Sequence, residues 1–150
     1  GEPVIGVIYN PASNEMFSCQ KGKGVYLNGH KVNASQKTNL LDASITVSRS
    51  EVKRKEWEPY RNDFKSINPI GSVAYKLALV SSGNYDIFTT IAPKNEWDIC
   101  AGDCLVMEAG GVFKTINDKK IIYNQKKTLV TDTIIATNSV LFEGVSDLLF

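Results

Sequence analysis

The chain has 150 residues, the usual size of one domain, and 43% of them are apolar, which is enough for a packed core. Seventeen Lys and Arg against sixteen Asp and Glu give a net charge of +1, which argues against binding a nucleic-acid polymer or a membrane surface through bulk charge. No apolar stretch approaches the ~18 residues that span a bilayer. We expect a cytoplasmic protein.

The first part of the chain predicts an antiparallel meander. An apolar run at Val4–Tyr9 is closed by the turn residues Asn10-Pro11, and a later turn is expected at Asn28-Gly29. The short strands expected around these turns cover residues 4–9, 16–19 and 25–27. We take residues 1–40 as the end of an N-terminal antiparallel sheet region.

From residue 41 to 150, strands alternate with helices. Ser72 is placed as the N-cap of a helix that ends at Gly83, and Glu51–Arg61 is a charged stretch that predicts a solvated helix. A helix from Trp97 to Ala109 is apolar nearly all round, so we expect it between two layers. A last, amphipathic helix is expected at residues 139–149, and strands at 45–48, 67–70, 85–90, 112–113, 121–122 and 134–136. The fold class is therefore α/β (α+β), with a meander followed by a mixed α/β layer.

Asp98 is the main candidate for chemistry. It lies in the first turn of the helix that begins near Trp97, where the helix dipole favours a carboxylate. Small residues one turn later, Ala101 and Gly102, let another group approach closely. One interpretation is a ligand for a hard cation such as Mg²⁺, which prefers carboxylate oxygens, and the other is that Asp98 only caps the helix.

Several motifs occur together in a known order. Trp97-Asp98-Ile99-Cys100-Ala101-Gly102, followed by Glu108-Ala109-Gly110-Gly111, resembles the second signature of the inositol monophosphatase family. Gly71-Ser72-Val73-Ala74 resembles the segment before that signature. The run from Gly6 to Pro11 and the segment Gly22–Gly29 resemble the middle section of the family. The resemblance covers essentially the whole chain.

The family consists of Mg²⁺-dependent, lithium-sensitive phosphomonoesterases with a layered α/β/α/β/α sandwich. The resemblance implies that Asp98 is a ligand of the second metal and that the backbone at Gly71 and Ser72 faces a small phosphorylated substrate. It also implies hydrolysis by metal-activated water. Family members commonly associate as dimers, so the resemblance implies a homo-oligomer.

The sequence departs from the family pattern in one major respect. Members carry a metal-binding glutamate and an Asp-Pro-x-Asp-Gly-Thr segment before this region, and this sequence has no such segment. We therefore interpret the chain as the C-terminal portion of a phosphatase, with no catalytic residue of its own, that is inactive or nearly so alone. The alternative is a non-catalytic oligomerisation or binding module derived from the family.

Two subtypes of the family compete for the substrate. Inositol-type members place an acidic residue about seven positions before the signature aspartate, where this sequence has Ile91. Members that act on 3′-phosphoadenosine 5′-phosphate carry Ser-Arg-Ser-His and then Gly-Ser-Ser-x-Lys. Here Ser48-Arg49-Ser50 is followed by Glu51, and Tyr75 stands at the place of the lysine. Neither subtype is favoured.

Two basic residues near these motifs have open roles. Arg49 can contact a phosphate bidentately, and an ion pair with an acid such as Glu51 is the equal alternative. Lys76, next to Tyr75 on the helix, is expected at the surface.

Overall fold

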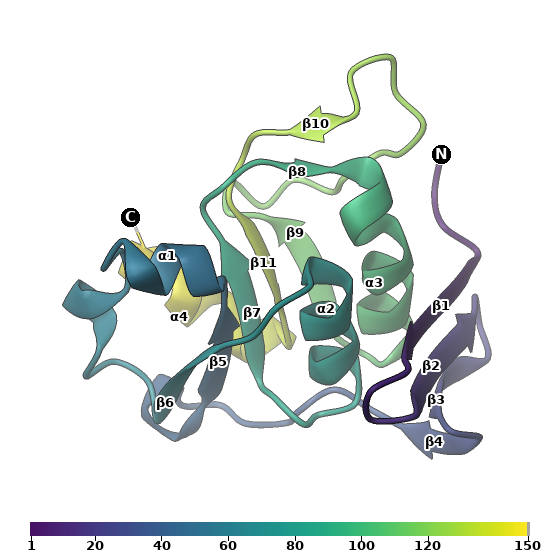
Figure 1. The fold of residues 1–150 in the computed structure, drawn as a ribbon, viewed down its shortest axis with the longest axis horizontal. Coiled ribbons are helices and arrows are strands. Elements are labelled where there is room, and N and C mark those ends of the chain that lie inside the picture. The colour runs from purple at the N-terminus through teal and green to yellow at the C-terminus, as the bar shows by residue number, and fades with distance from the viewer. Residues whose placement is uncertain (150) are drawn as a thin grey trace.

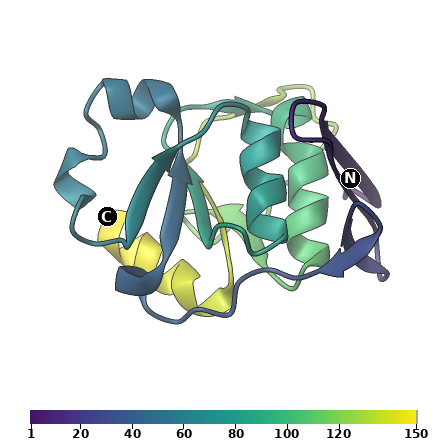
Figure 2. The same cartoon turned by 60° about the horizontal axis from the view of Figure 1, so that its bottom comes forward.

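The computed structural model describes residues 1–149 and arranges them in alternating layers of sheet and helix (Figure 1). Two helices lie between a smaller and a larger sheet, and a further helix covers the far face of the larger sheet (Figure 2). The mixed α/β class is confirmed. None of the helices within residues 1–149 is long and apolar enough to cross a membrane.

The smaller sheet is the predicted antiparallel meander. It contains, in order, β1 (Ile5–Asn10), β2 (Glu15–Gln20), β3 (Gly24–Leu27) and β4 (His30–Val32). Alternation along β1 buries Ile8 against the helices and leaves Val7 on the outer face.

The larger sheet is mixed, with the strand order β6-β5-β7-β11-β9. Strand β5 pairs in parallel with β6 and β7, whereas β11 runs antiparallel to β7 and β9. The strands cover Ser44–Val47 (β5), Ser66–Pro69 (β6), Ile87–Thr90 (β7), Val112–Thr115 (β9) and Ile134–Thr137 (β11). A separate ribbon pairs β8 (Lys94–Asn95) with β10 (Leu129–Val130).

Helices α2 (Val73–Ser81) and α3 (Glu96–Glu108) fill the space between the sheets. They approach closely because Gly102 of α3 has no side chain: a Cβ there would lie 2.3 Å from Cδ1 of Leu77. Helix α4 (Ser139–Leu149) buries Leu141 and Val145 against the other face of the larger sheet. The expected place of α3 between two layers is confirmed.

The helix expected at Glu51–Arg61 is wrong. Helix α1 covers Arg49–Lys53 only, and the chain continues through turns to a 3₁₀ turn at Glu58–Tyr60. Lys55 adopts a φ of 62°, which ends an α-helix, and Glu51 is fully buried rather than solvated. A second 3₁₀ turn precedes β5 at Leu40–Asp42.

The strand expected at residues 121–122 is also wrong. Ile121 is buried and Ile122 is exposed, but the segment pairs with no strand of the sheets within residues 1–149. The segment is a loop whose residues Ile121 and Tyr123 pack into the core.

Candidate functional site

The candidate site lies at one edge of the larger sheet. Because β5, β6 and β7 are parallel, their carboxyl ends meet there. Ser48 and Arg49 follow β5, Gly71 and Ser72 follow β6, and Ile91 follows β7. In α/β sheets this edge is where ligands bind.

Three predicted substrate residues line one open cavity of about 490 Å³ at this edge: Arg49, Gly71 and Ser72. The Arg49 guanidinium packs against Gly71, where a Cβ would lie 3.4 Å from Cζ of the arginine. The Ser72 side chain caps α2 by accepting a hydrogen bond of 3.2 Å from the backbone N–H of Tyr75. The structure therefore brings Arg49, Gly71 and Ser72 together at one cavity.

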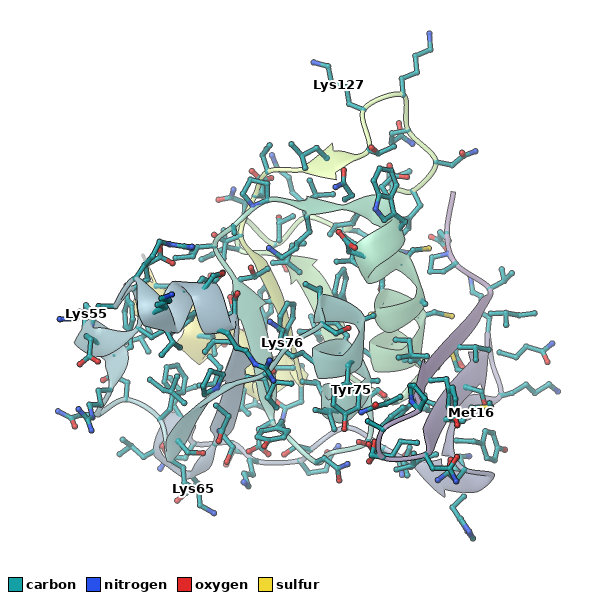
Figure 3. The ribbon with its side chains drawn as sticks, in the orientation of Figure 1. Met16, Lys55, Lys65, Tyr75, Lys76 and Lys127 are labelled. Carbon is teal, nitrogen blue, oxygen red and sulfur yellow. The ribbon has the colours of Figure 1, made fainter. Side chains whose placement is uncertain are left out.

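The opposite wall of the cavity comes from the smaller sheet. Tyr9, Asn10 and Pro11, at the end of β1, face Tyr75 of α2 across it. The Tyr75 hydroxyl donates to Oε2 of Glu15 at 2.6 Å (Figure 3). Burial, and then this hydrogen bond, raise the pKa of Tyr75, so the hydroxyl stays protonated as a donor. This contact joins α2 to strand β2 of the smaller sheet beside the cavity.

Arg49 itself is exposed and makes no ion pair within 4.0 Å in the part of the chain that the structure describes. The alternative of an ion pair with Glu51 is therefore not formed. Its guanidinium faces the cavity with its donors available for an anion.

Asp98 lies half-buried in the first turn of α3, outside the lining of the Arg49 cavity. Burial lowers the pKa of Lys94, just before this helix, and the charges of Glu51 and Asp98 oppose that lowering. Asp98 offers a carboxylate, the type of group that a hard cation prefers. Within residues 1–149 no group of three His, Cys, Asp or Glu side chains could hold a metal ion, so these residues alone do not complete a Mg²⁺ site.

Glu96 fixes the start of α3. Its side chain accepts hydrogen bonds from the backbone N–H of Asn124, at 2.7 Å, and of Gln125, at 3.1 Å. Its own N–H donates to the carbonyl of Thr128. The loop before β10 is thus tied to the turn that carries Asp98.

Sequence reasoning missed the roles of Glu51 and Lys76. The prediction that Lys76 lies at the surface is wrong, because the side chain is 2% exposed and its Nζ lies 5.2 Å from the ring centre of Phe88. For Glu51 a signal existed: Ser48 followed by Glu51 has the spacing of a capping box, and the box forms.

Comparisons with known proteins match nearly the whole chain to one family. The profile of the inositol monophosphatase family matches residues 1–147. A fructose-1,6-bisphosphatase/inositol-1-monophosphatase of Thermotoga maritima is 31% identical over 136 residues, which cover 90% of this chain and 53% of the relative. An inositol monophosphatase 2 of Solanum lycopersicum is 34% identical over 119 residues, 74% of this chain and 45% of the relative.

Among solved structures, that of an inositol monophosphatase from Anabaena (Nostoc) superposes with a TM-score of 0.85 at 25% identity. The match covers 99% of this chain and 59% of that one. The chain spans about half the length of the curated relatives that it matches.

Proposed function

The chain belongs to the inositol monophosphatase family, and on that premise we propose that it is the C-terminal portion of a Mg²⁺-dependent phosphatase for small phosphate monoesters. The alternative of a non-catalytic module is not favoured, because the family match extends over residues 1–147. A cytoplasmic location and a homo-oligomer are parts of this proposal.

The observation that carries the proposal is the cavity at the carboxyl edge of the parallel strands. Arg49 offers a guanidinium that can bind phosphate oxygens in pairs, beside backbone that Gly71 leaves open. We propose that a phosphorylated substrate binds here.

We propose Asp98 as one ligand of a Mg²⁺ ion. Of the two carboxylates in the first turn of α3, Glu96 is engaged by backbone N–H groups of the loop before β10, which leaves Asp98. This supports a shared site, whose other ligands come from the part of the relatives outside the match. The ion would neutralise phosphate charge and activate a water. We expect the described residues alone to have little or no phosphatase activity.

The substrate is either an inositol phosphate or 3′-phosphoadenosine 5′-phosphate. Ile91, which is exposed after β7, cannot accept a hydrogen bond from a sugar hydroxyl. Glu51 is buried, so its charge does not face the cavity. Neither observation separates the two esters completely.

A competition assay tests the substrate. This chain would be fused behind the preceding part of the Thermotoga maritima relative, and phosphate release from both esters would be measured with Mg²⁺. A large preference in kcat/KM for inositol 1-phosphate would exclude the nucleotidase type, and the opposite preference would exclude the inositol type. No release from either ester, by a folded fusion, would contradict the proposed function itself.

A further inference from the structure

A buried carboxylate lies two residues after Arg49, at the carboxyl edge of the parallel strands. The Glu51 side chain of α1 is fully buried and accepts hydrogen bonds from three donors. Oε2 accepts from Nε1 of Trp57 at 3.1 Å and from the backbone N–H of Ser48 at 3.3 Å, and Oε1 accepts from Oγ1 of Thr90 at 2.8 Å. An ionised carboxylate without such partners would be very costly to bury, so this one is held in a single arrangement.

The three donors belong to separate segments. Ser48 directly follows β5, Thr90 is the last residue of β7, and Trp57 lies in the turns that lead away from α1. Glu51 therefore links the carboxyl ends of two neighbouring parallel strands. Arg49 follows the end of β5. The segment that runs through Lys94 to Asp98 follows the end of β7.

A buried lysine packs against the same strand, β7, that the Glu51 carboxylate contacts through Thr90. The Lys76 side chain reaches from α2 to Phe88 of β7 (Figure 3), and within the described residues its Nζ forms no ion pair within 4.0 Å and no hydrogen bond. Burial lowers the pKa of Lys76 to about 8, Glu51 opposes this lowering, and Lys94 adds to it. Around Lys94 the charged groups are Glu51, Asp98 and Arg54. Glu51 is thus the only negative charge that acts on Lys76 among these groups.

We propose that Glu51 is a positioning residue for the candidate site: its carboxylate ties the ends of β5 and β7 together and is the counter-charge of Lys76. Its role in the reaction is indirect. It keeps Arg49 at the cavity and keeps the segment before Asp98 in place, and so determines how tightly a phosphorylated substrate is held. The kinetic part of this inference rests on the proposed function, but the electrostatic interaction of Glu51 with Lys76, at a distance beyond a direct ion pair, does not.

Glu51→Gln separates the charge from the hydrogen bonds. The amide oxygen can accept from Ser48 and Trp57, and the Thr90 hydroxyl can turn to accept from the new NH₂ group. The matched control is Glu56→Gln, which removes the charge of a carboxylate in the same segment that pairs with Arg54 at 2.7 Å.

The direct test follows the titration of the Lys76 side chain by NMR in the 150-residue chain, with Lys76→Met to assign the signal. We expect Glu51→Gln to lower the midpoint by about one pH unit, because the nearest opposite charge is gone. Glu56→Gln should leave the midpoint unchanged. An unchanged Lys76 midpoint in Glu51→Gln would overturn the proposed electrostatic interaction between Glu51 and Lys76.

A second measurement covers the case in which Glu51→Gln does not fold. If the two groups are counter-charges, the double variant Glu51→Gln/Lys76→Met loses both buried charges and should fold where Glu51→Gln does not, or unfold at a higher denaturant concentration than the single variant. A double variant that is no more stable than Glu51→Gln would overturn the inference.

The kinetic readout separates positioning from stability. In the fusion described above, a folded Glu51→Gln variant should raise KM about tenfold with a smaller effect on kcat. Glu51→Asp keeps the charge and should recover part of the loss. Equal KM values for the wild type and Glu51→Gln would refute the positioning role, whereas a fusion inactive with every ester would refute the proposed function and leave the NMR result standing.

Discussion

Asp103 of α3 is a buried carboxyl group whose ionisation affects stability. It is 5% exposed, and the Tyr123 hydroxyl donates to its Oδ2 at 2.7 Å. Burial raises its pKa from 3.8 to about 6, against the opposing effect of Tyr123. The native state therefore binds more protons than the unfolded state between those pH values. Stability from this group is fully present below pH 3.8 and is lost as the pH rises towards 6.

We predict that Asp103→Asn raises the free energy of unfolding at pH 7 by about 1–3 kcal/mol, because the amide still accepts from Tyr123 but carries no buried charge. Urea unfolding at several pH values between 4 and 7 measures the free energy of unfolding. The variant should lose less of it over this range than the wild type. Asp118→Asn, at an exposed pair with Lys114, is the control and should change little. Equal pH dependence in Asp103→Asn and the wild type would contradict this account.

Among single residues, the sequence predicted those roles that depend on the position of a residue at a helix end. Ser72 could be predicted as an N-cap because its type and place in the chain fit that role, and Gly71, Ser72 and Arg49 do line one cavity. The burial of Lys76 could not be predicted, because it depends on Phe88 and Glu51, which are distant in sequence. The roles of Asp98 and Arg49 stay predictions.

Among the elements, the pair α2 and α3 depends on one close contact. A Cβ at Gly102 would lie 2.5 Å from Cβ of Leu77, an atom that cannot move without its backbone. Gly144 of α4 is different, since the nearest atom to a Cβ there is the flexible Cδ1 of Leu40 at 3.3 Å.

We predict that Gly102→Ala destabilises the chain by about 1–3 kcal/mol, because α2 and α3 must separate. Gly144→Ala is the matched control and should be neutral or slightly stabilising, since alanine is the better helix former. Denaturant midpoints of both variants measure the difference. Similar midpoints for the two would show that the helices do not meet as closely as described.

Element types were predictable where periodicity and turn residues agreed, as in the meander and in α3. The prediction of a helix at Glu51–Arg61 was wrong because a run of charged residues does not indicate which of its carboxylates will be buried. Glu51 turns inward to Trp57, Thr90 and Ser48, and the chain curls around it. Tertiary contacts of this kind override local propensity.

At the scale of the whole molecule, the outer face of the smaller sheet is apolar. The exposed apolar side chains on it are Ile5, Val7 and Tyr9 of β1 and Met16 of β2. Met16 is labelled in Figure 3. Strand β1 is also an edge strand within the described residues. Apolar faces at open edges favour association.

We predict that the 150-residue chain self-associates and that Val7→Lys, which places a charge in the middle of β1 on this face, reduces the association. Val140→Lys is the control, because Val140 is 53% exposed on α4 and Val7 is 54% exposed. Light scattering over a range of protein concentrations measures the molar mass of the wild type and of both variants. A wild-type chain that is monomeric throughout would disprove the prediction.

The central claim is that this chain carries part of a phosphatase site, with Asp98 as a metal ligand completed by residues outside it. The most direct test is Mg²⁺-dependent phosphate release by the 150-residue chain, by its fusion to the preceding part of the Thermotoga maritima relative, and by the fusion with Asp98→Asn. We predict release by the fusion only, with a loss of roughly a hundredfold or more in Asp98→Asn, since mutating groups that only orient a metal ligand already costs ~10–100-fold. Mg²⁺-dependent release by the 150-residue chain alone, or full activity in the Asp98→Asn fusion, would contradict the claim.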